Sequence, residues 1–161
     1  MAARDILFIG VLLFTFGIGF FIIHFMMDTV VTEIVSIPAL NATNASVDAW
    51  ESIRTTTNRL DYVIFGLFIG LVLALIITSW FIGGNPIYMF IYFIIIIIAV
   101  VISTVLANTW ETVSGMVVFG TTIVSFPITN NLLLKLPIYI AVVGFIGIIT
   151  MFAKPYFTGE E

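Results

Sequence analysis

The chain has 161 residues, of which 61% are hydrophobic and only 9% are charged, and its formal net charge is −4. A soluble domain carries roughly 25% charged residues, so the charges here are too few to keep a soluble surface hydrated. Five basic residues and a net negative charge also argue against a nucleic-acid partner. The composition indicates a protein whose main solvent is the lipid bilayer.

Charged residues are missing from long stretches of the chain, and these stretches predict transmembrane helices. The segment between Asp61 and Glu111 contains no Asp, Glu, Lys or Arg and is long enough for two spans of about 20 residues. The run of five isoleucines at 94–98 lacks the alternation of a membrane β-barrel strand, which leaves helices as the structure that satisfies the backbone in lipid. We therefore expect one all-α, polytopic membrane domain over 1–161, with both termini on one side. Its transmembrane helices are predicted at about 5–27, 61–83, 86–107 and 131–153.

The longest polar segment, residues 28–60, lies between the first two predicted spans. On both sides of a Pro- and Asn-containing tip at 38–45, apolar residues recur in steps of three and four, a spacing typical of packed helices. We predict that the first two helices continue beyond the membrane as an antiparallel hairpin stalk, with an irregular polar loop as the alternative. The stalk residues predicted to pack together are Val30, Ile34, Ile37, Trp50, Ile53 and Leu60.

Two features of this part of the chain leave questions open. Asn41 and Asn44 begin triplets that match the glycosylation pattern, although such triplets are common by chance. The few basic residues are divided between the two predicted sides, so the membrane orientation is not determined by the positive-inside rule.

Residues 108–130 differ from the predicted spans. They carry one charge, Glu111, and are interrupted by Gly115, Gly120 and Pro127. The stretch is too broken for a straight span and too apolar to lie free in water. We expect a short helix or turn at the membrane interface, or one packed against neighbouring chains.

Aromatic residues flank the third predicted span. Tyr88 and Tyr92 lie near one end and Trp110 just beyond the other. Such residues are enriched where a membrane meets water, so we expect them at the two interfaces.

Small residues predict where helices approach closely. Gly66, Gly70 and Ala74 recur every four residues on the second span, and such residues allow close helix contact in a bilayer. We expect this face to pack within the chain, with a dimer interface as the alternative. Gly10 and Gly17, and Gly144 with Gly147, are candidates for the same role.

Side chains able to carry chemistry are scarce. His24, the one histidine, lies four residues before Asp28, so the two could share a helix face. A proton relay would need further buried titratable groups, and we expect instead an interfacial histidine partnered by a carboxylate or by water. Paired carboxylates occur only in the predicted stalk and at the C-terminus, and cysteine is absent. The sequence predicts no catalytic, cofactor or metal site, and therefore no enzyme.

Residues 60–154 contain, in this order, LDYVIFGLFIGLVLALIITSWFIGGNPIY, ANTWETV, FPITNNLLLKLP and GIITMFAK. This order resembles small multi-span membrane proteins of tailless, membrane-containing icosahedral viruses. The resemblance includes no catalytic motif. It implies a structural protein of the internal virion membrane, beneath a capsid shell, with other membrane or capsid proteins as partners; a homo-oligomer is a further option.

Two other functions fit a small polytopic protein. One is an accessory subunit of a large cellular membrane complex, and the other is a pore, holin or transporter. Transporters usually place charged residues or broken helices at mid-membrane, whereas the centre of each predicted span here is uncharged. We expect a structural membrane protein that links the bilayer to an overlying protein shell.

Overall fold

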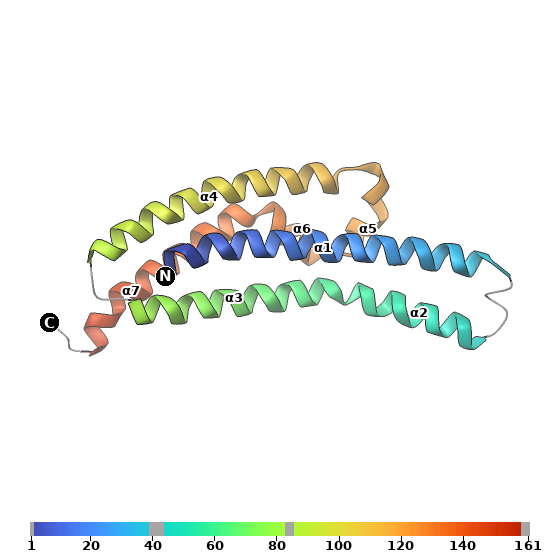
Figure 1. Cartoon of the computed structure of the whole chain (residues 1–161), viewed down its shortest axis with the longest axis horizontal. Coiled ribbons are helices and arrows are strands. Elements are labelled where there is room, and N and C mark those ends of the chain that lie inside the picture. Colours follow the sequence, from blue (N-terminus) through green and yellow to red (C-terminus); the bar gives the residue numbers. More distant parts are fainter. Residues whose placement is uncertain (1, 39–43, 83–85, 159–161) are drawn as a thin grey trace.

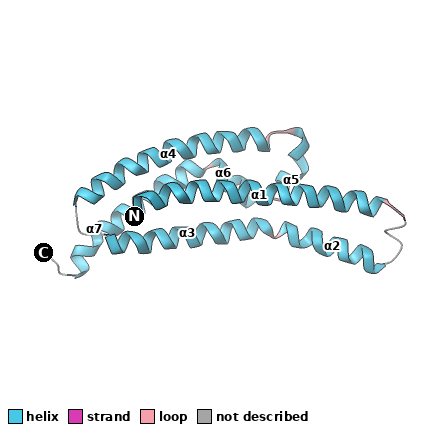
Figure 2. Cartoon of the chain, in the orientation of Figure 1, coloured by secondary structure: helices cyan, strands magenta, loops and turns pink. Residues whose placement is uncertain are grey.

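The structure is a computed structural model that describes residues 2–38, 44–82 and 86–158, and every regular element in these ranges is a helix (Figures 1 and 2). Residues 39–43 of the predicted tip, including Asn41, lie outside the described residues. The helices confirm the all-α expectation. They are α1 (Ala2–Ser36), α2 (Asn44–Asn58), α3 (Leu60–Ile82), α4 (Pro86–Ser114), the 3₁₀ helix η1 (Val117–Phe119), α5 (Gly120–Val124), α6 (Pro127–Leu134) and α7 (Leu136–Thr158).

Four long helices, α1, α3, α4 and α7, form an antiparallel bundle (Figure 1). Helix α4 packs on α7 and α1, and α3 packs on the other side of α1 and on α7. Helix α1 begins and α7 ends at the same end of the bundle, whereas α2 lies beside the last part of α1 at the far end (Figure 1). The bundle interior holds apolar side chains from all four helices, among them Ile6, Leu13, Phe21, Ile64, Leu75, Ile96, Leu136, Ile140 and Met151.

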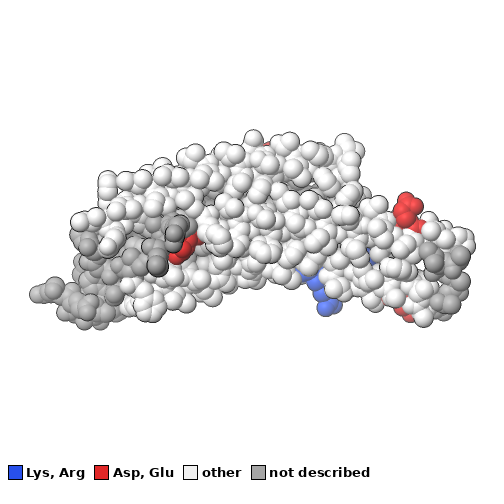
Figure 3. Space-filling model, viewed as in Figure 1, with Lys and Arg blue, Asp and Glu red and all other residues white. Residues whose placement is uncertain are grey.

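The outside of the bundle is as apolar as its interior. Within the isoleucine run of α4, Ile96 faces the core, whereas Ile97 and Ile98 are 50% and 46% exposed. Figure 3 shows a face that is almost free of charge along the bundle, with most coloured residues gathered around α2 and the end of α1. Soluble monomers rarely expose such a continuous apolar surface. Within the part of the chain that the structure describes, four helical segments are long and apolar enough to cross a membrane: Asp5–Ser36, Ala45–Phe81, Ile87–Ser114 and Leu136–Ala153.

Helix α4 ends later than the sequence indicates, at Ser114 instead of 107. Its polar residues do not break the helix, because the hydroxyls of Thr109 and Thr112 donate to backbone carbonyls one turn earlier, at 2.9 and 3.0 Å. Gly115 directly follows the end of the helix, and its N–H donates to the Glu111 carbonyl. The predicted segment 108–130 is therefore divided, with its first part in α4 and the rest in η1, α5 and the start of α6.

The fourth predicted span, 131–153, is broken at Lys135 into α6 and α7. Pro137 explains the break, because proline has no N–H and its ring clashes with the carbonyl four residues earlier, that of Leu133. Helix α6 makes an angle of 113° with the preceding Val117–Val124 segment, so the chain turns back toward the bundle. The side chains of Leu132 and Leu133 are buried there.

Glycines of α1 and α7 permit the close approach of the helices. A Cβ atom at Gly17 would lie 2.8 Å from the Leu133 side chain, and one at Gly144 would lie 2.9 Å from side chains of Ile6 and Ile96. A Cβ atom at Gly147 would overlap with the phenol oxygen of Tyr92. The role expected for these glycines is confirmed.

The prediction that Gly66, Gly70 and Ala74 pack within the chain was wrong. All three are exposed, and a Cβ atom at Gly66 or Gly70 would have no described neighbour within 4 Å. Helix α3 instead turns its opposite face, with Ile64 and Leu75, toward the bundle. Small residues alone did not identify the packed face, because lipid can cover a small-residue face as well as a helix can.

Helix α2 packs with the face that its sequence predicts, but α1 does not. Trp50 and Ile53, and Leu60 at the start of α3, are partly buried. On α1, Ile34 is partly buried, whereas Val30 is 45% exposed and the neighbouring Val31 is buried. Ile37, directly after the end of α1, is also 45% exposed. The prediction that Val30 and Ile37 pack in the stalk was therefore wrong. Since α1 is apolar on more than one face, hydrophobic spacing does not select the face that meets α2.

The glycine contacts lead to a prediction with a matched control. Gly147→Ala should destabilise the bundle by about 1–3 kcal/mol relative to Gly70→Ala, because the new methyl group overlaps with Tyr92. Both changes add the same helix propensity, so that contribution cancels. The measurement is the free energy of unfolding in mixed micelles by titration with SDS. Equal stabilities for the two variants would contradict the packing of α7 against Tyr92.

Candidate functional site

The carboxylate of Asp61 is buried near the start of α3, an unusual position for a charged group. Its oxygens accept three hydrogen bonds from the N-terminal end of α6. Oδ2 accepts from the Ile128 backbone N–H at 3.0 Å, and Oδ1 accepts from the Thr129 backbone N–H at 2.7 Å and from the Thr129 hydroxyl at 2.6 Å. Asp61 therefore caps a helix that lies more than sixty residues away in the sequence.

Helix α6 needs such a cap because its own sequence lacks one. The first N–H groups of a helix have no partner within it, and a Ser, Thr, Asp or Asn at the preceding position usually accepts one of them. Here Phe126 occupies that position and makes no side-chain cap, while Pro127 at the first helical position has no N–H. The next two donors both reach Asp61. The partial positive charge at the N-terminus of α6 also favours a carboxylate at this point.

The bend between α2 and α3 comes directly before Asp61. The hydroxyls of Thr56 and Thr57 donate to the carbonyls of Ser52 and Ile53, four residues earlier. Hydrogen bonds of this kind often bend a helix. The helix is interrupted at Arg59, so α2 and α3 follow different directions (Figure 1).

A second hydrogen bond joins α4 to α6. The indole N–H of Trp110, which is fully buried, donates to the side-chain oxygen of Asn130 at 3.0 Å. The ring of Phe21 from α1 meets Trp110 and Phe126 edge-on, with centroid distances of 5.1 and 6.0 Å. Helices α1, α3 and α4 thus all hold the N-terminus of α6. We name this group the junction cluster: Phe21, His24, Asp61, Trp110, Phe126, Thr129 and Asn130.

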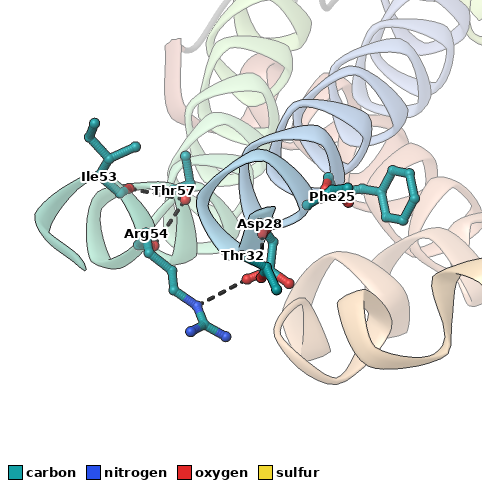
Figure 4. A network of polar contacts seen from close by, with 7 residues as sticks. Phe25, Asp28, Thr32, Ile53, Arg54 and Thr57 are labelled. Carbon is teal, nitrogen blue, oxygen red and sulfur yellow. Dashed lines mark hydrogen bonds and ion pairs between the residues drawn. The ribbon is translucent and has the colours of Figure 1, made fainter. Parts of the chain in front are cut away.

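His24 belongs to the junction cluster but does not have the partner expected for it. Its ring lies 4.9 Å from that of Phe126, and its Nδ1 has no hydrogen-bond partner among the described residues. Asp28 pairs instead with Arg54 of α2, with 3.0 Å between Arg54 Nε and Asp28 Oδ1 (Figure 4). Asp28 is therefore not the carboxylate partner expected for His24, because the histidine turns into the bundle. The alternative partner, a water molecule, stays a prediction.

A smaller polar group lies near the other end of the bundle. The hydroxyls of Ser79 and Tyr92 are both buried beside Gly147, between α3, α4 and α7. The side chains of Tyr92 and Trp110 thus point into the protein. Their position at the level of the two membrane interfaces stays a prediction. Tyr88 is exposed.

The junction cluster is built to hold helices together. The Asp61 carboxylate is enclosed and engaged by three donors, so it is not placed to take a proton from a substrate. No group of three or more His, Cys, Asp or Glu side chains among the described residues could hold a metal ion. In the sequence, Asp61 marks only the edge of a predicted span. The feature that could have indicated its role is a helix start, at Phe126 and Pro127, that has no local cap.

Comparison with known proteins gives no relative to assist the assignment. No protein-family model, curated protein or solved structure matches the chain.

The cap leads to a prediction about stability. Asp61→Ala should destabilise the protein by about 1.5–3 kcal/mol, because buried donors of α6 lose a charged acceptor. Asp61→Asn, which keeps one acceptor oxygen, should lose less. Asp48→Ala on the exposed side of α2 is the control and should stay within about 0.5 kcal/mol of the parent. Unfolding in mixed micelles measures all three, and equal stability of Asp61→Ala and Asp48→Ala would contradict the cap.

Proposed function

We propose that the chain is a non-enzymatic structural membrane protein in which α1 and α2 form a stalk that links the bilayer to an overlying protein layer. The length of α1 carries this proposal. Its 35 residues extend about 52 Å at 1.5 Å per residue, whereas the hydrocarbon core of a bilayer is about 30 Å thick. A helix of this length crosses the hydrocarbon and leaves roughly 20 Å for the region outside it.

The junction cluster and the buried hydroxyls of Ser79 and Tyr92 lie near opposite ends of the bundle, and their separation supports a position for the hydrocarbon layer between them. Trp110 follows Tyr92 by eighteen residues on α4, and Ser79 follows Asp61 by eighteen residues on α3. Each interval corresponds to about 27 Å of helix, close to the thickness of the hydrocarbon core. Polar groups at these two levels would lie at the edges of the hydrocarbon. On this placement the bundle spans the bilayer, and the last residues of α1 stand outside with α2.

The polarity of α2 is consistent with an aqueous environment for the stalk. The Arg54–Asp28 pair joins α2 to α1, and its side chains are exposed enough that it contributes only about 0–1 kcal/mol. Such an ion pair helps to select the relative position of the two helices, but it adds little to the stability of the fold. The outer face of α2 forms an open hollow of about 470 Å³, lined by Asp48, Glu51, Ser52, Thr55, Thr56 and Arg59.

This outer face of α2 is the surface that we assign to the partner. It presents both acidic and basic groups together with hydroxyls, a composition that suits the polar surface of a protein. Two spans can be joined by a short link, so a long paired extension indicates a contact outside the bilayer. The resemblance to membrane proteins of icosahedral viruses suggests that the membrane is the internal membrane of a virion and the partner a capsid protein.

The placement of the stalk can be tested with single cysteines in this cysteine-free chain. A cysteine at Thr55, on the exposed side of α2, should react with a membrane-impermeant maleimide in sealed vesicles that present the stalk outside. A cysteine at Ile97, on the exposed side of α4, should not react, because lipid covers it. Equal labelling at the two positions would contradict the stalk.

The partner contact has a separate test. Glu51→Lys reverses a charge in the hollow of α2 and should reduce the fraction of the chain that stays with the sedimenting protein layer after mild detergent removes the lipid. Glu111→Lys, the same change at an exposed position on the end of α4, is the control. If neither variant changes the retained fraction, α2 is not the contact surface.

A further inference from the structure

Helix α1 has two apolar faces, and only one of them is used within the chain. The inner face, which includes Leu13, Gly17, Phe21, His24 and Val31, is buried against the other helices. The second face continues from the bundle to the end of the helix in alternating steps of four and three residues, without a charged residue. We name it the outer seam: Phe16, Phe20, Ile23, Met27, Val30 and Ile34 of α1, and Ile37 directly after the end of the helix.

The outer seam keeps one row of exposed residues along its whole length. Its residues Phe16, Ile23, Val30 and Ile37 follow one another at intervals of seven and are 42–47% exposed, and the three residues between them are partly buried. Helix α2 does not cover this row. It meets α1 through the side that carries Asp28, as the ion pair with Arg54 shows (Figure 4).

The outer part of α1 makes this seam informative. Inside the hydrocarbon any apolar residue is acceptable, so Phe16 and Ile23 alone would indicate only contact with lipid. Beyond the junction cluster, polar residues are available and occupy other faces, as Thr29, Thr32 and Glu33 do. Burial of apolar side chains is favourable by about 25 cal/mol per Å², so an apolar row in water that α2 leaves open indicates another occupant.

We infer that two copies of the chain pair through the outer seam, α1 against α1, as a parallel coiled coil that runs from the hydrocarbon into the stalk. The inference takes from the proposed function only the position of the bilayer. Apolar steps of four and three sustained over three heptads are the pattern of helices that pack knobs into holes.

The continuity of the seam selects a second copy as the occupant. A second copy of α1 can cover Ile23 within the bilayer and Val30 outside it with one continuous helix, whereas lipid reaches only the former and a soluble shell protein only the latter. A membrane protein inserts all its copies in one orientation, so a second copy presents the same seam, parallel and in register, about a two-fold axis normal to the membrane. Gly19 lies beside the seam without a described side chain near it, which permits close approach.

Disulfide formation between identical single cysteines tests this arrangement in vesicles at low protein density. Cysteines at Ile23 and Val30 should form a covalent dimer on oxidation, because seam positions of a parallel pair bring equivalent Cα atoms within about 7 Å. Cysteines at Ile22 and Thr32 are the matched controls, exposed at nearly the same heights but on other faces of α1. These two variants should remain monomeric.

The outcomes separate this inference from the proposed function. No dimer at Ile23 and Val30, or equal dimer at Ile22 and Thr32, would overturn the pairing, whereas labelling at Thr55 in the same vesicles reports on the stalk independently. A second measurement avoids dependence on disulfide chemistry. Val30→Glu places two carboxylates in the seam and should convert the dimer to a monomer in sedimentation of the detergent-solubilised protein. Thr32→Glu should leave it a dimer, and equal sedimentation of the two variants would again overturn the pairing.

Discussion

Helix α6 begins within an apolar bundle, and the carboxylate of Asp61 accepts hydrogen bonds from its first N–H groups. The first N–H groups of α6 lie within the bundle, where a buried donor left without an acceptor would cost about 1–3 kcal/mol. Helix α3 supplies the missing acceptor, and two backbone groups and one hydroxyl of α6 converge on it. The bond between Trp110 and Asn130 then adds α4 to the same point. The course of the chain from α4 through α6 to α7 depends on this cap.

Other polar groups in the bundle are accommodated within their own helices. Threonine hydroxyls on α1, α3, α4 and α7 donate to carbonyls one turn earlier, as Thr15, Thr78, Thr104 and Thr150 do. Such side chains can face lipid or core without needing a partner on another helix. The groups that do require a partner, the Asp61 carboxylate and the Trp110 indole, are therefore the ones that decide how helices are arranged.

Packing in a membrane depends on close fit, because lipid competes with protein for every apolar surface. Gly17, Gly144 and Gly147 allow that fit on α1 and α7, and their neighbours fill the space that a side chain would occupy. The glycines of α3 and the outer seam of α1 are left for lipid or for other chains. The two sets of small residues look alike in sequence, and only the contacts distinguish them. The surfaces left open are also the ones that are available for assembly with other chains.

The sequence by itself determined the four apolar helices and the packing face of α2. Membrane spans follow from local composition, since the free energy of placing a segment in lipid is a sum over its own residues. Helix α2 was predictable because polar residues surround Trp50 and Ile53 and leave a single apolar face. The packing face of α1 was not, since Val30 and Val31 are equally apolar and only the tertiary structure shows that Val31 is buried and Val30 exposed. Tertiary structure alone decided the depth of His24 and the cap by Asp61. A donor and an acceptor that lie far apart in the chain meet only when the bundle forms, so a local sequence pattern cannot predict the hydrogen bond between them.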